Sequence, residues 1–193
     1  MCTTKDAIRP LLSTYNEPIE FLPMSPGQST HIEVVREELE KVRLRFLHLL
    51  NTVSEKDWNR RFPGEGWTIK QEMVHIVQVL YVIPTGIQQA SAGRGRSLLA
   101  IVPAGLRSWV NGHIVIPMMS KNATRTTIAD KYNKAHIALI DLLEALPEGS
   151  WSKGMPYPRK YRTVGQMAHR PAEHFEEHLE HLQNVLRIKI KDV

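Results

Sequence analysis

The sequence is poor in cysteine and lacks long apolar runs, and both shortages narrow the class of protein. Its single cysteine, Cys2, cannot form a disulfide within the chain, which favours a reducing, cytoplasmic location. No stretch of about 18 apolar residues is present, so we expect no membrane-spanning helix. The N-terminus also lacks the apolar h-region of a signal peptide, so secretion is not expected. The alternating pattern of a half-buried strand is also missing, so we expect no sheet.

The composition is otherwise that of an ordinary globular protein. The 193 residues, 42% of them hydrophobic and 23% charged, are enough for one domain with its own core. The net charge of +5 comes from basic residues spread among acidic neighbours, without a basic stripe interleaved with aromatics. Nucleic acid is therefore not expected as a partner.

The spacing of apolar residues predicts a long first helix after an irregular N-terminal arm. Residues 1–29 contain four prolines and few periodic positions, which is typical of an extended arm. Thr30 and Glu33 form a capping box, the sequence signature of a helix start. From Ile32 to Val53 the apolar residues recur in steps of three and four, as on the buried face of a helix. We expect residues 30–193 to form a single domain.

A second helix is predicted after the capping box of Thr68 and Gln71. It is expected to end near Ile83, because Pro84 and Gly86 follow.

Residues 85–126 are the least regular part of the sequence. They are expected to form a long connection with a short helix near residues 106–110. A connection of this length is usually a lid, an interface or a set of extra short helices. Its apolar runs also offer a surface for a homodimer.

Two further helices complete the prediction of an all-α, four-helix bundle. One is expected to begin at Thr127. After a connection over residues 148–162, the capping box of Thr163 and Gln166 predicts the start of the last helix. Pro171 lies inside this helix and is expected to kink it.

The last helix has histidines where a bundle core normally has leucine or isoleucine. His174, His178 and His181 all lie on its core-facing seam. His174 and His178 are four residues apart, so their rings project from one face and can offer two nitrogens to one metal ion. The alternative is a structural row, because such pairs also arise by chance. In the second helix, His75 lies between apolar neighbours near the buried side, where it needs a polar partner.

The order of these motifs resembles that of the DinB/YfiT-like superfamily of small helical bundles. One half of the pattern is Trp67–His75, a turn ending in tryptophan followed by a capped helix with a buried histidine. The other half is Thr163–His178, which contains the His-x-x-x-His pair. The resemblance covers roughly residues 30–190.

This resemblance implies a metal-dependent enzyme. In that family three histidines bind a divalent metal, commonly zinc or nickel, and the matching positions here are His75, His174 and His178. Three imidazoles leave an open coordination position, which suits a catalytic metal. Members include thiol S-transferases, a maleylpyruvate isomerase and proposed hydrolases. The metal is thus expected to activate either a low-molecular-weight thiol, such as bacillithiol or mycothiol, or a water against a small-molecule substrate. The alternative is a non-catalytic metal-binding or interaction bundle.

The roles of the neighbouring polar residues stay open at this stage. Glu177 is a candidate to orient a ligand imidazole or to act as a base, whereas Glu173 and Glu176 are expected on a solvated face. His181 is a candidate extra ligand, hydrogen-bond donor or polar core residue. The segment His174–His178 also matches the H-x-x-E-H motif of inverted zinc proteases, but those folds contain sheets.

Overall fold

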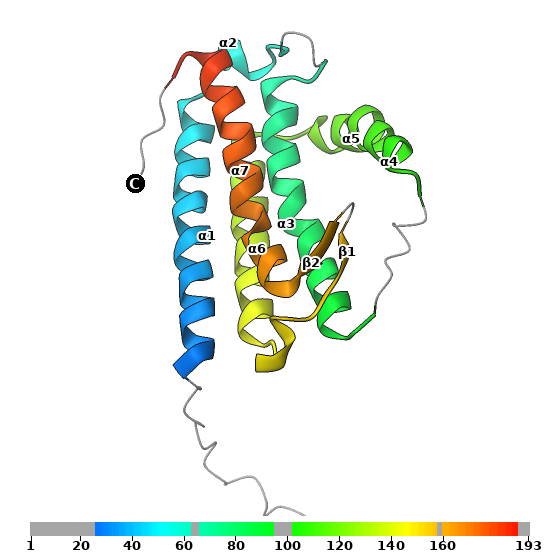
Figure 1. Ribbon diagram of the computed structural model, residues 1–193. Helices are drawn as coiled ribbons and strands as arrows, with labels where there is room; N and C mark the ends of the chain where they lie inside the picture. The colour runs from blue at the N-terminus through cyan, green and yellow to red at the C-terminus, as the bar shows by residue number, and fades with distance from the viewer. Residues whose placement is uncertain (1–25, 63–65, 95–101, 158–159, 189–193) are drawn as a thin grey trace, which may run out of the picture.

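The computed structural model describes residues 26–62, 66–94, 102–157 and 160–188, and it confirms the all-α bundle. Its framework is made by α1 (Pro26–Thr52), α3 (Ile69–Ser91), α6 (Arg125–Glu144) and α7 (Val164–Leu186) (Figure 1). Both α1 and α3 contact α6 and α7, so α6 and α7 lie between α1 and α3. None of the described helices has the length and apolar character needed to cross a membrane.

The core is aromatic where α1, α6 and α7 meet. The ring of Phe46 stacks on Tyr132 with centroids 4.5 Å apart and meets Phe175 edge-on at 6.3 Å. All three side chains are buried, and burial of this size dominates the stability of a small bundle. Burial also raises the pKa of Tyr132 well above its ordinary value, so its hydroxyl is neutral.

A helical crossover allows α3 and α6 to run in the same direction. Between them, α4 (Ala104–Val110), the π-helical turn η2 (Asn111–Val115) and α5 (Ile116–Ser120) follow one another beside α3 (Figure 1). We call residues 104–120 the crossover segment. It packs on α3 and buries Ile116 completely.

Helix α3 extends beyond the proline that was expected to end it. The predicted end near Ile83 is wrong, since α3 continues through Pro84 to Ser91. A proline inside a helix removes one hydrogen bond and crowds the carbonyl four residues earlier, and packing of the following turns offsets that cost. Gly86 is buried there, and a Cβ on it would lie only 3.1 Å from the ring of Tyr157. The glycine is therefore a close-packing position and not a helix stop.

The predicted start of the first helix is also wrong. Helix α1 begins at Pro26, so residues 26–29 belong to it, and Thr30 is not its cap. Proline suits the first turn of a helix because no partner is needed there for the missing N–H. The rest of the expected arm, residues 1–25, lies outside the described part of the chain.

Three capping boxes fix the starts of the other long helices. Those of Thr68 and Thr163 are present as predicted. Helix α6 starts earlier than expected, at Arg125, because Thr124 caps it and Thr127 supplies the other half of the box. A threonine hydroxyl can replace the usual Glu or Gln in this role, which the sequence pattern did not reveal.

The chain between α6 and α7 contains a small β-hairpin, and the expectation of no sheet is wrong here. Strands β1 (Gly154–Tyr157) and β2 (Lys160–Thr163) pair antiparallel, after the short helix η3 (Glu148–Ser150). Strands of four residues are too short to show a clear alternation. Strand β1 contacts α3 and β2 contacts α7, so the hairpin joins the two helices.

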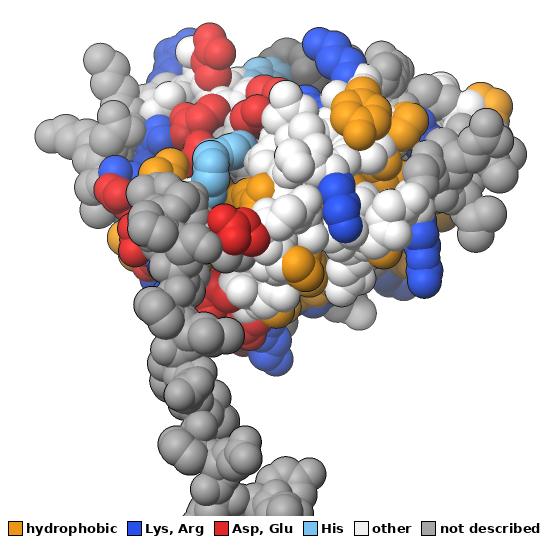
Figure 2. All heavy atoms as spheres, turned by 60° about the horizontal axis from the view of Figure 1, so that its bottom comes forward, with side chains coloured by type: hydrophobic (Ala, Val, Ile, Leu, Met, Phe, Trp, Pro, Cys, Tyr) orange, Lys and Arg blue, Asp and Glu red, His pale blue; other side chains and the backbone are white. Residues whose placement is uncertain are grey.

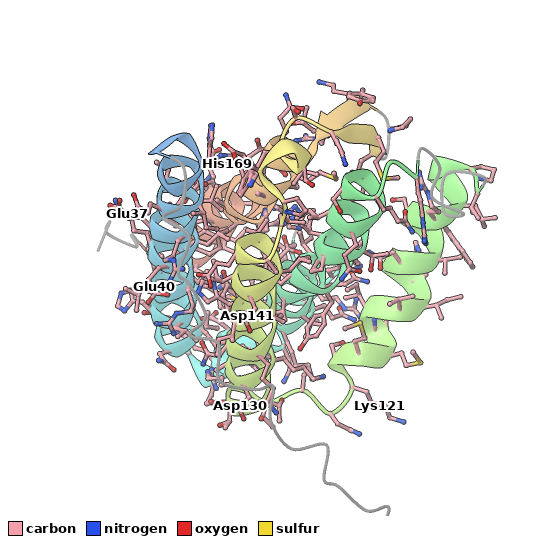
Figure 3. The ribbon with its side chains drawn as sticks, turned by 90° about the horizontal axis from the view of Figure 1, so that it is seen from below. Glu37, Glu40, Lys121, Asp130, Asp141 and His169 are labelled. Carbon is pink, nitrogen blue, oxygen red and sulfur yellow. The ribbon has the colours of Figure 1, made fainter. Side chains whose placement is uncertain are left out.

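Ion pairs join the helices at the lower end of the bundle, where acidic and basic side chains are interspersed (Figure 2). Arg36 of α1 pairs with Glu144 of α6, and Glu38 of α1 pairs with His169 of α7. Seen from below, His169 lies beside α1 (Figure 3). Exposed pairs of this kind contribute at most about 1 kcal/mol each. The apolar core therefore sets the register of the helices.

Candidate metal centre

Helices α3 and α7 bring together three imidazoles from distant parts of the sequence. One nitrogen from each of His75, His174 and His178 lies within 4.8 Å of the other two. The ring centroids of His174 and His178 are 4.2 Å apart, and that of His75 lies 4.9 Å and 5.0 Å from them. Within the described ranges this is the single group of three or more potential ligands whose atoms converge in this way.

His178 is held by a buried carboxylate that sequence reasoning missed. Its Nδ1 donates a hydrogen bond to Oε1 of Glu72, a side chain only 2% exposed. Glu72 precedes His75 by three residues on α3, so the two side chains share a face of that helix. This spacing was the available signal. A carboxylate on Nδ1 fixes the orientation of the ring and leaves Nε2 free, as metal-binding histidines require.

His75 is oriented by an amide and covered by an indole. Its Nδ1 lies 3.3 Å from Oε1 of Gln78. The ring of Trp67 meets it edge-on at 5.0 Å, and the indole N–H donates to the carbonyl oxygen of Gly112 over 3.0 Å. The partner on Nδ1 again leaves Nε2 available to the centre of the cluster.

His174 has one partnered and one orphaned nitrogen. Its Nδ1 lies 3.4 Å from a guanidinium nitrogen of Arg170 and 3.5 Å from Oε2 of Glu177. Its Nε2 is fully buried and has no hydrogen-bond partner among the described residues. An unpartnered nitrogen in such a place costs free energy, and a metal ion bound by Nε2 would remove that cost. The donor set therefore fits a metal.

The environment keeps the imidazoles of His75 and His174 neutral. Burial, and next the proximity of His178, lowers the pKa of His75 below its ordinary value. The same two causes, joined by His75 and Arg170, lower the pKa of His174 to about 3. Neutral imidazole is the form that binds a metal, so the site is prepared for one at neutral pH.

Glu177 lies on the outer side of the cluster. Both of its oxygens accept hydrogen bonds from Arg170, at 2.7 Å and 2.9 Å, and this lowers the pKa of the carboxyl group. The ion pair lies against Nδ1 of His174. Of the two roles considered for Glu177, its position suits orientation of His174 and leaves it poorly placed as a base.

The other candidate side chains on α7 have partners outside the cluster of three rings. His181 packs against Phe62, with centroids 4.7 Å apart, and lines a cleft of about 680 Å³ at the C-terminal end of α7. None of the three clustered histidines lines that cleft. Glu173 and Glu176 are exposed and pair with arginines.

The low pKa of His174 predicts acid sensitivity of the metal-stripped protein. In the unfolded chain the imidazole takes up a proton near pH 6.5, whereas in the folded chain it does so near pH 3. The unfolded state therefore binds more protons between these values, and stability falls as the pH falls. We expect the free energy of unfolding to drop by about 1.4 kcal/mol from pH 7.5 to 5.5 through this group alone. Urea unfolding at both pH values measures the drop. The variant His174→Gln should show a smaller drop in the free energy of unfolding. A drop equal to the parent's would contradict its assignment to protonation of His174.

Comparison with known proteins places this geometry in a family. No curated protein matches the sequence. The fold is similar to that of YfiT from Bacillus subtilis, described as a probable metal-dependent hydrolase with an unusual four-helix bundle topology. The two share 16% sequence identity and a TM-score of 0.59, over 90% of this chain and 94% of that one, which shows a common fold. The DinB superfamily model matches residues 38–182, a span that includes all three histidines. This chain therefore belongs to the DinB superfamily.

Proposed function

We propose that the protein is a metal-dependent enzyme acting on a small molecule, with His75, His174 and His178 binding one divalent ion, zinc or nickel. The observation that carries this proposal is the orphaned, buried Nε2 of His174 beside two rings whose Nδ1 atoms are already partnered. Each ring thus has one nitrogen free for the same ion. Three protein ligands, with a further position open to water or substrate, are the usual arrangement of a catalytic metal.

The residues around the ligands have distinct tasks in this proposal. An ion bound there would supply Lewis acidity and lower the pKa of a water or thiol. Glu72 contributes a buried negative charge that partly balances the ion and holds His178 in place. Arg170 and Glu177 hold His174 from outside. Trp67 covers one side of His75 and limits access of solvent to that ligand.

We favour hydrolysis as the reaction, in which the activated nucleophile is water. The description of YfiT, which shares the fold, as a probable metal-dependent hydrolase supports this choice. Transfer of a low-molecular-weight thiol such as bacillithiol or mycothiol would use the same three ligands. A bundle that retains the metal without catalysis is the remaining alternative. A site of the inverted zinc-protease type, H-x-x-E-H, is disfavoured. Glu177 would be its general base, but this carboxylate is hydrogen-bonded to Arg170.

The reaction class is tested with zinc-loaded and nickel-loaded protein on two panels. One contains small esters and amides, and the other pairs low-molecular-weight thiols with electrophiles. We expect turnover on the first panel, its loss in His178→Ala, and nearly full activity in Glu176→Ala, whose exposed side chain pairs with Arg45 outside the cluster. Turnover on the second panel alone would replace hydrolysis by S-transfer. Absence of turnover on both would favour the non-catalytic alternative.

The buried carboxylate is tested through metal affinity. Glu72→Leu removes the acceptor for Nδ1 of His178, so we expect zinc to bind about 10- to 100-fold more weakly in competition with a chromophoric chelator. Glu72→Gln keeps an acceptor oxygen and should lose less. Glu176→Ala is the control and should bind zinc like the parent. Parental affinity in Glu72→Leu would show that the carboxylate does not support the site.

A further inference from the structure

A chain of side-chain hydrogen bonds connects the crossover segment to His75. Gln78 is its middle member. Its Oε1 lies 3.3 Å from Nδ1 of His75, and its Nε2 donates to Oδ1 of Asn111 over 2.7 Å. All three side chains are partly buried. These hydrogen bonds therefore link a candidate metal ligand on α3 to η2, which lies in the least regular part of the sequence.

The direction of these bonds determines which nitrogen of His75 is free. Because the carbonyl oxygen of Asn111 can only accept, the NH₂ group of Gln78 faces it. The amide oxygen of Gln78 then faces His75 and accepts from its Nδ1–H. A neutral imidazole protonated at Nδ1 keeps its lone pair on Nε2, which is the nitrogen left for the ion.

The π-helical turn places a second contact beside the first. Asn111 begins η2, and the next residue, Gly112, accepts the indole N–H of Trp67 at 3.0 Å. Trp67 in turn contacts the ring of His75. Single π-helical turns inside helices occur often at functional sites. Here two successive residues of such a turn support one imidazole. The fully buried Ile116 follows the turn as the first residue of α5, which contacts both η2 and α3.

We propose that Asn111 is a positioning residue of the centre, which acts through Gln78 to fix the ring orientation and tautomer of His75. The crossover segment thereby sets the metal affinity of a site whose ligands all lie on other helices. This inference rests on the proposed metal-dependent function, because its consequence for affinity requires that His75 be a ligand.

The experiment measures two quantities in the full chain: the tautomer of His75 in metal-free protein, by long-range ¹H–¹⁵N NMR, and the affinity for zinc, by chelator competition. In Asn111→Leu and Gln78→Leu we expect about tenfold weaker zinc binding and loss of the pure Nδ1–H tautomer. Asn111→Asp retains an acceptor for Gln78 and should restore both. The matched controls are Asn122→Leu and Gln88→Leu, at exposed positions outside the relay, and they should behave like the parent.

The outcomes separate the relay from the metal site itself. Parental zinc affinity and an unchanged tautomer in both leucine variants would overturn the relay while leaving the three-histidine site intact. Failure of the parent to bind zinc or nickel would overturn the proposed function, and the relay's role in metal affinity with it. The tautomer of the metal-free protein would still show whether Asn111 orients His75. If Asn111→Leu disturbs the π-helical turn, as the backbone amide chemical shifts of residues 111–115 would reveal, Gln78→Leu on the regular helix α3 decides the result.

Discussion

The antiparallel contact between α3 and α7 is the constraint on which the site depends. It brings His75 and Glu72 of one helix against His174 and His178 of the other, with ring centroids 4.2–5.0 Å apart. Sliding either helix by one turn, about 5.4 Å, would separate both the rings and the buried hydrogen bond. Capping boxes fix where each helix begins, and the apolar core fixes their register. The geometry of the site is thus a consequence of how the bundle packs.

The polar groups at this contact are arranged around the outer nitrogens of the rings. Each Nδ1 has a neighbour from a different source: a carboxylate, an amide, and an arginine–glutamate pair. The centre of the cluster differs, since Nε2 of His174 has no hydrogen-bond partner among the described residues. A bundle selected for stability alone would place leucine at such a position. The cost of this buried polar cluster is explained if the protein binds a metal there.

The features that could be predicted from the sequence are those that depend on residues close together in the chain. The helical period, the capping threonine at Thr68 and the four-residue spacing of His174 and His178 are all visible in short windows. The fold and the convergence of the histidines could therefore be anticipated with the help of the family pattern. What failed depends on contacts between distant segments. Pro84 lies inside a helix because the turns beyond it are buried, and Glu72 became apparent only from its position against α7.

The role proposed for His75, His174 and His178 is to bind one metal ion together. The most direct measurement is elemental analysis of the purified protein beside a His75→Ala variant, after both have been equilibrated with zinc or nickel and freed of unbound ion. We expect about one ion per chain in the parent and none in the variant, because two histidines on one helix lack the third ligand. Absence of metal from both proteins would contradict this role and would make the histidines a structural row. Equal metal content in both would show that His75 is not a ligand.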